Sequence, residues 1–199
     1  MCHEYKIVLI GNSGVGKTSL VRLYESGRPQ ETTLPSVGLE FVLKQVNLNK
    51  KDYLLKIWDT SGQEKFKSLA KTFYKNCKGF LVIFSVDDLN SFVEVERWIS
   101  EIADNSSRPC WILIGNKIDV RFRQVTSAQA FQLAKKYEVP YYETTIFEDK
   151  RPENSQTIAE VFKQLVTMLD KNEGRPLKME RNFKLSVALV PQPKGGCCR

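Results

Sequence analysis

The stretch Gly11-Asn12-Ser13-Gly14-Val15-Gly16-Lys17-Thr18 matches the pattern G-x-x-x-x-G-K-[ST] and decides the fold. It follows an apolar run, Tyr5–Ile10, that is typical of a short buried strand, and it opens a segment with helical character, Thr18–Glu25. Glycines reach backbone conformations closed to other residues, so the loop can turn its N–H groups toward phosphate oxygens at the positive end of the helix. We predict a nucleoside triphosphate site in which Lys17 reaches the β- and γ-phosphates and the Thr18 hydroxyl binds Mg²⁺. The residues predicted to line it are Ser13, Gly14, Val15, Gly16, Lys17, Thr18 and Ser19.

A second polar motif follows the alternating strand Tyr53–Trp58. Asp59 is placed to hold Mg²⁺ through a bound water. The Gly62 amide can bond a γ-phosphate oxygen that exists only in the triphosphate, and Gln63 is placed to orient an attacking water. An aspartate three residues before a glycine is weak evidence for a nucleotide site by itself. It becomes strong evidence when it follows a phosphate loop at this distance.

A third motif, Gly115-Asn116-Lys117-Ile118-Asp119, closes the apolar strand Trp111–Ile114. The Asp119 carboxylate can accept hydrogen bonds from guanine N1–H and from the 2-amino group. Adenine lacks both donors and would leave the carboxylate unpaired. Asn116 can brace the loop and the stem of Lys117 can cover the ring, so the predicted base is guanine.

Strands and helices alternate along residues 5–170, which predicts an α/β fold. The continuous apolar runs Phe80–Val86 and Trp111–Ile114 are typical of central parallel strands, whereas Leu39–Leu48 and Tyr53–Trp58 alternate and read as a hairpin joined at Asn47–Asp52. Apolar residues have helical spacing in Phe92–Ile102, Ala128–Tyr137 and Ile158–Leu169. We expect a mostly parallel six-stranded sheet with helices on both faces and with ligands at the carboxyl ends of the strands.

The 199 residues suit one domain and a tail, which we place at 1–170 and 171–199. With 42% apolar and 27% charged residues, the composition excludes a disordered chain or a fibre.

The N-terminus lacks a secretory pattern, which indicates the cytosol. Of the net charge of +7, the tail carries +5, so we expect no nucleic-acid-binding face. The five cysteines suit neither disulfides nor zinc, and Cys77 and Cys110 are expected to be buried.

The three motifs, in their order and spacing, resemble the small GTPases of the Ras superfamily over residues 5–170. Within it the chain looks most like the Rab branch. Three stretches carry that resemblance: Val37-Gly38-Leu39-Glu40-Phe41, Lys56-Ile57-Trp58-Asp59-Thr60-Ser61-Gly62-Gln63-Glu64-Lys65-Phe66, and Phe73-Tyr74-Lys75-Asn76-Cys77-Lys78-Gly79.

The resemblance implies a switch that binds GTP or GDP with Mg²⁺, hydrolyses GTP slowly without an activating protein, and regulates vesicle traffic. Switch I would span 29–39, with Pro35 and Ser36 at the nucleotide and Ser36 also at the metal; switch II would span 59–74, with Gln63 as the catalytic residue. Residues Glu143-Thr144-Thr145-Ile146 occupy the place where the family has the sequence E-T-S-A. Within this segment, Thr145 and Ile146 would contact the base. The implied partners are an exchange factor, a GTPase-activating protein, a GDP-dissociation inhibitor, a prenylation escort and effectors that bind the switches; the chain itself would be a monomer.

The chain ends in Cys197-Cys198-Arg199, which resembles the Rab signal for double geranylgeranylation. Two lipid chains anchor more firmly than one, and the basic tail adds attraction to anionic lipids. We therefore expect Cys197 and Cys198 to be lipidated and the protein to cycle between the cytosol and the cytoplasmic face of intracellular membranes.

Three departures from the family pattern leave alternatives open. Pro29 replaces an aromatic ring expected against the guanine, Ser36 replaces a threonine, and Ile146 replaces an alanine. They motivate a rival hypothesis: a nucleotide-binding scaffold, or an atypical GTPase, that cycles poorly. An ATP-directed enzyme is a third reading, which Asp119 disfavours. The segment Phe147–Gln156 is longer than usual and is expected to be a surface loop.

Overall fold

The computed structural model describes residues 3–29, 40–60, 74–106, 109–152 and 155–173. Six of the predicted site residues lie outside these ranges: Pro35, Ser36, Gly62, Gln63, Cys197 and Cys198.

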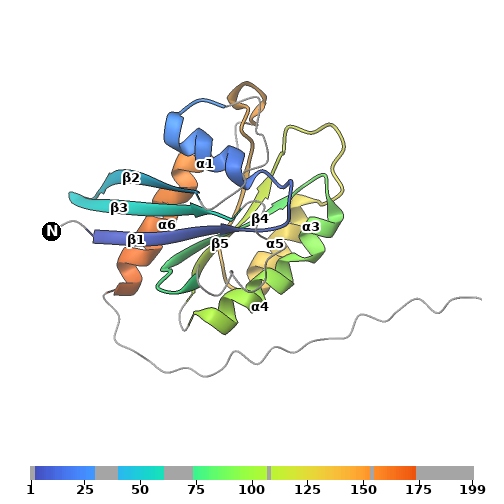
Figure 1. Ribbon diagram of the computed structural model, residues 1–199. Coiled ribbons are helices and arrows are strands. Elements are labelled where there is room, and N and C mark those ends of the chain that lie inside the picture. Colours follow the sequence, from blue (N-terminus) through green and yellow to red (C-terminus); the bar gives the residue numbers. More distant parts are fainter. Residues whose placement is uncertain (1–2, 30–39, 61–73, 107–108, 153–154, 174–199) are drawn as a thin grey trace, which may run out of the picture.

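The strands form one six-stranded sheet in the order β2-β3-β1-β4-β5-β6, as Figure 1 shows. Only the pair β2–β3 is antiparallel; the other neighbours run parallel. The mostly parallel six-stranded sheet predicted from the sequence is therefore confirmed. The strands are β1 (His3–Ile10), β2 (Glu40–Leu48), β3 (Lys51–Asp59), β4 (Gly79–Ser85), β5 (Cys110–Asn116) and β6 (Tyr141–Thr144).

Helices cover both faces of the sheet (Figure 1). Successive side chains of a strand point to opposite faces, and in β1 Ile7 and Leu9 join one core cluster while Val8 and Ile10 join the other. The first cluster is completed by α1 and α6, and the second by α4 and α5. The helices are α1 (Lys17–Ser26), α3 (Leu89–Val93), α4 (Val95–Asn105), α5 (Ser127–Lys136) and α6 (Ile158–Glu173), with a 3₁₀ turn at Glu148–Lys150.

The predicted helix Phe92–Ile102 is in fact two helices. The Asp88 carboxylate accepts bonds from the backbone N–H groups of Asn90 and Ser91, and so starts α3 one turn before the apolar pattern begins. Glu94 lies between α3 and α4: its N–H bonds the carbonyl of Asn90, as in an α-helix, and also that of Phe92, and its ψ of −8° departs from the helical value.

The hairpin between β2 and β3 forms where the sequence predicts it. Asn49 and Lys50 occupy its turn with φ of 52° and 63°, the left-handed values that two-residue hairpin turns need. β6, which the apolar pattern did not locate, is short and only partly buried. Within the described ranges, no helix has both the length and the apolar character that crossing a membrane requires.

Candidate nucleotide-binding site

At two positions of the phosphate loop a side chain would clash with the sheet, so glycine at these positions allows the loop to lie close to it. Gly11 has a φ of 145°, and a Cβ there would lie 2.0 Å from the Ile83 carbonyl oxygen on β4. Gly16 has a φ of 99°, and a Cβ there would lie 2.3 Å from Asn116 Nδ2 at the end of β5. The loop is thus pressed against β4 and β5, between the end of β1 and the start of α1.

The ammonium of Lys17 lies back over this loop. Lys17 is only 2% exposed, and its Nζ donates to the carbonyl of Gly11 at 2.9 Å and to that of Asn12 at 2.8 Å. A buried ammonium needs such acceptors to offset the loss of hydration. The positive charge is therefore held at the mouth of the loop, where a phosphate would meet it.

Thr18 and Asp59 face each other beside the lysine. The Thr18 hydroxyl donates to Asp59 Oδ2 at 2.5 Å, and Asp59 is 5% exposed. The next residue, Thr60, bonds the carbonyl of Leu9 at 2.7 Å, which ties the end of β3 to β1. A hydroxyl and a carboxylate oxygen this close together are ligands of the kind that Mg²⁺ prefers, so the residues present fit this ion.

The base-reading motif lies where β5 and β6 end. Asn116 Nδ2 donates to the carbonyl of Val15 at 2.8 Å, which connects this motif to the phosphate loop. The Thr145 hydroxyl donates to Asp119 Oδ1 and accepts from the Phe147 N–H at 3.2 Å. Asp119 is therefore held in place by the loop that follows β6.

Two buried polar atoms at this edge lack a hydrogen-bond partner among the described residues: Asn116 Oδ1 and Thr144 Oγ1. The two residues are opposite each other in the β5–β6 ladder. Unsatisfied buried polar atoms are rare in proteins and tend to mark sites that a ligand or water completes. Sequence reasoning did not find Thr144; pairing β5 with a sixth strand would have brought it to Asn116.

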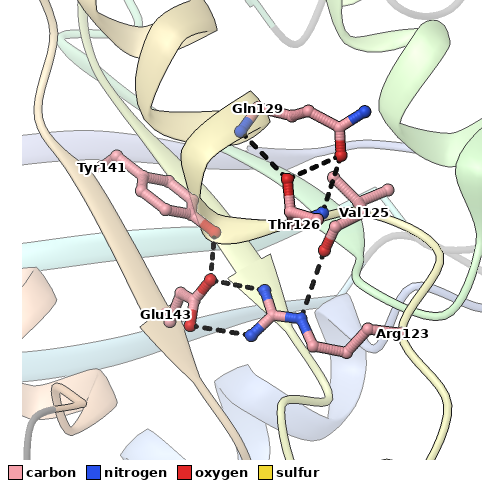
Figure 2. A network of polar contacts seen from close by, with 6 residues as sticks. All are labelled: Arg123, Val125, Thr126, Gln129, Tyr141 and Glu143. Carbon is pink, nitrogen blue, oxygen red and sulfur yellow. Dashed lines mark hydrogen bonds and ion pairs between the residues drawn. The ribbon is translucent and has the colours of Figure 1, made fainter.

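An ion pair behind the base-reading loop was also missed (Figure 2). Arg123 donates to both oxygens of Glu143, with Nη2–Oε1 at 2.6 Å and Nη1–Oε2 at 3.2 Å. The Tyr141 hydroxyl donates to the same Oε1 at 2.7 Å, and Arg123 Nε donates to the carbonyl of Val125 at 3.2 Å. The segment after Asp119 is thereby fastened to β6, just before Thr145.

The charges in this network shift one another's titration. Burial raises the pKa of the Glu143 carboxyl, but the bonds from Arg123 and Tyr141 outweigh burial, so the pKa lies below its ordinary value. The hydrogen bond to Glu143 raises the pKa of the Arg123 guanidinium, and burial followed by the bond to Glu143 raises that of Tyr141.

Most of the predicted site residues that the structure describes meet at the carboxyl ends of β1, β3 and β5. Ser13 and Gly14 are exposed at the loop, and Ile146 is partly buried and packs against the core cluster beneath α1 and α6. Pro29 is exposed, so in this structure it does not form part of the core. The predicted burial of Cys77 and Cys110 is confirmed, and burial raises their pKa values to about 12 and about 11.

Phe41, Trp58 and Phe73 fall where the Rab resemblance implies an effector-facing aromatic cluster, and the structure describes the first two. Phe41 on β2 is 49% exposed and lies 4.9 Å, centroid to centroid, from the ring of Trp58 on β3. Phe73, the third predicted member, lies outside the described residues.

Comparison with known proteins agrees with this site. The model of the Ras family matches residues 6–171. The chain is 32% identical to the Ras-related protein Rab-13 of Bos taurus over 179 residues, covering 88% of this chain and 85% of the relative. It is 31% identical both to the Ras-related protein Rab-9A of Mus musculus, over 201 residues, and to the GTP-binding protein YPT1 of Saccharomyces cerevisiae, over 198 residues; each match covers 98% of this chain and 96% of the relative.

These matches do not favour the hypothesis of a scaffold that cycles poorly. The relatives cover 88% to 98% of the chain, and the Ras family model spans all three motifs. The chain belongs to the Ras family, in which it is a Rab-like small GTPase that binds GTP and GDP, hydrolyses GTP and acts in vesicle traffic at intracellular membranes.

Proposed function

We propose that this GTPase holds its nucleotide along the edge where β1, β3 and β5 end. The phosphates would lie against the N–H groups of residues 13–19 and the Lys17 ammonium, and guanine would lie against Asp119, Lys117 and Ile146. What supports this is that Asn116 contacts the phosphate loop while Thr145 contacts Asp119, so both ends of the site are joined in one structure.

In this proposal Thr18 and Ser36 would bind Mg²⁺ directly, and Asp59 would hold it through a bound water. The ion would neutralise charge that develops on the β- and γ-phosphates as the bond between them breaks. The Lys17 ammonium, held by the carbonyls of Gly11 and Asn12, would remain oriented toward the same oxygens throughout.

Hydrolysis would proceed by in-line attack of a water on the γ-phosphorus. Gln63 would orient this water, and the Gly62 N–H would bond a γ-phosphate oxygen. Loss of the γ-phosphate would release Gly62 and Ser36 together, so the two switches would distinguish GTP from GDP. An exchange factor, a GTPase-activating protein and effectors would act on these switches.

Membrane attachment would come from the end of the chain. Geranylgeranyl groups on Cys197 and Cys198 would anchor the protein to the cytoplasmic face of intracellular membranes, and residues 171–199 would link them to the domain. A prenylation escort would deliver the protein, and a GDP-dissociation inhibitor would return it to the cytosol. Intact mass measurement of protein from prenylating cells tests this, because the bare polypeptide mass contradicts it.

The nucleotide proposal is tested by release of a fluorescent GDP with and without Mg²⁺. We expect chelation to accelerate release from the wild-type protein. Thr18→Val keeps the shape of the side chain but lacks the metal ligand, so its release is expected to be fast in both conditions. Thr126→Val, which changes an exposed threonine that caps α5, is the control. A Thr18→Val protein that keeps the wild-type dependence on Mg²⁺ contradicts the proposed metal site.

A further inference from the structure

One side chain of α4 reaches the phosphate loop. The Trp98 indole N–H donates to Asn12 Oδ1 at 2.9 Å, across 86 positions of sequence. Trp98 is 5% exposed, so this bond is largely shielded from water. The sequence pattern predicts Trp98 as a packing residue only, because its place on the buried face of a helix explains its position without any bond.

Asn12 makes a second contact at the same point of the loop. Its backbone carbonyl accepts from Lys17 Nζ at 2.8 Å. The side-chain oxygen of Asn12 therefore accepts a bond from α4, and its backbone oxygen accepts one from the Lys17 ammonium. A bond that holds the Asn12 side chain also limits how far the backbone of this residue can shift, and with it the carbonyl that accepts from Lys17.

The helix that carries Trp98 is a firm support. Val95, Ile99 and Ile102 are each at most 2% exposed in the core cluster beneath α4 and α5. One turn after Trp98, Glu101 accepts a bond from the buried hydroxyl of Tyr74 at 3.1 Å. A donor on such a helix can hold a loop in one position because the helix itself has little freedom to follow it.

We propose that Trp98 is a positioning residue of the phosphate site, whose indole N–H holds Asn12 so that the Gly11 and Asn12 carbonyls orient the Lys17 ammonium. This inference rests on the proposed phosphate site. Since α4 acts on the phosphate end alone, both GDP and GTP are released faster when the bond is lost. The preference for guanine over adenine does not change, because Asp119 lies at the other end of the site.

The test compares Trp98→Phe with Trp111→Phe. Both tryptophans are 5% exposed, but Trp111 lies on β5 with its ring against Tyr137, in the half of the strand remote from Asn116. Release of a fluorescent GDP and of a non-hydrolysable GTP analogue is measured in Mg²⁺, and the urea midpoint of each variant is recorded. We expect release about three- to tenfold faster from Trp98→Phe than from Trp111→Phe, the range of one net hydrogen bond.

A variant of the acceptor separates the bond from the packing of the ring. Asn12→Leu removes the oxygen and Asn12→Asp retains one, so we expect fast release from the first and near wild-type release from the second. Combining Asn12→Leu with Trp98→Phe should add little, because either change already breaks the bond. If Trp98→Phe does not fold, the two Asn12 variants decide.

The outcomes against the two proposals differ. A folded wild-type protein that binds neither GDP nor GTP overturns the proposed site. Normal binding by the wild type, with Trp98→Phe and Asn12→Leu releasing nucleotide no faster than Trp111→Phe, overturns the role of Trp98 and leaves the site intact.

Discussion

We expect Gly16→Ala to destabilise the protein, because the added methyl group would clash with Asn116. A Cβ at this position would lie 2.3 Å from Asn116 Nδ2, a contact that real side chains do not show. Gly16→Ala must therefore push the Asn116 amide away from the Val15 carbonyl, to which it now donates at 2.8 Å. Asn116 is 2% exposed, so the displaced amide cannot turn to water instead.

Gly14→Ala is a matched control for this change. Gly14 also has a positive φ, 79°, but a Cβ there would meet nothing within 4 Å. Both substitutions cost about 1–3 kcal/mol of backbone strain. Only Gly16→Ala also leaves a buried polar group unsatisfied, which costs roughly 1–3 kcal/mol more.

The assay is equilibrium unfolding in urea without nucleotide, so that contacts with a ligand do not enter. We expect Gly16→Ala to have a free energy of unfolding about 1–3 kcal/mol lower than Gly14→Ala, and a melting temperature lower by about 2–4 °C for each kcal/mol. In an Asn116→Ala background the difference between the two glycine variants should nearly vanish. Equal midpoints in the wild-type background would refute the reasoning.

Three further predictions concern the base end of the site. Asp119→Asn should weaken GTP binding on the order of tenfold or more in competition with a fluorescent GDP, because a charged acceptor is lost; unchanged affinity would contradict base reading by Asp119. Thr144→Val should leave the urea midpoint of the nucleotide-free protein unchanged or raise it, since its buried hydroxyl has no partner among the described residues, whereas Thr145→Val should lower it. A lower midpoint for Thr144→Val would reveal a partner. The pKa of Glu143 is below its ordinary 4.5, so the ion pair stabilises the fold above that pH and the stabilisation is lost as the pH falls through the native value; Glu143→Gln should flatten this acid-induced loss, and identical acid unfolding curves would contradict it.

The sequence predicts the sheet and the motifs well because their signals are local. A continuous apolar run can be recognised as a central strand without knowing its neighbours, and β4 and β5 form as expected. The break between α3 and α4 was missed because the apolar residues keep helical spacing across it. The start of α3 at Asp88 and the change of backbone conformation at Glu94 leave no mark on the apolar pattern.

The supporting residues of the site could not be predicted in the same way. Trp98 and Arg123 bond partners that are 86 and 20 positions away, and Thr144 lies opposite Asn116, 28 positions away, in the β5–β6 ladder. Each has an ordinary local explanation: a tryptophan on an apolar helix face, a surface arginine, a threonine in a strand. Their roles appear only when the sheet order places β6 beside β5 and α4 beneath the phosphate loop.

Asn116 connects the two ends of this site, and the connection is steric as well as polar. Its amide bonds the Val15 carbonyl, and Gly16 lacks a side chain where that amide lies. The phosphate loop can therefore keep its close approach to β5 only while Asn116 keeps its position, which the β5–β6 pairing with Thr144 sets. A change in the base-reading loop that moves Asn116 must then disturb the phosphate loop directly. For that reason we expect substitutions at Asn116 to loosen triphosphate and diphosphate alike, whereas substitutions at Asp119, whose carboxylate accepts from Thr145 in the loop after β6, should change the preference for the base and leave the phosphate loop in place.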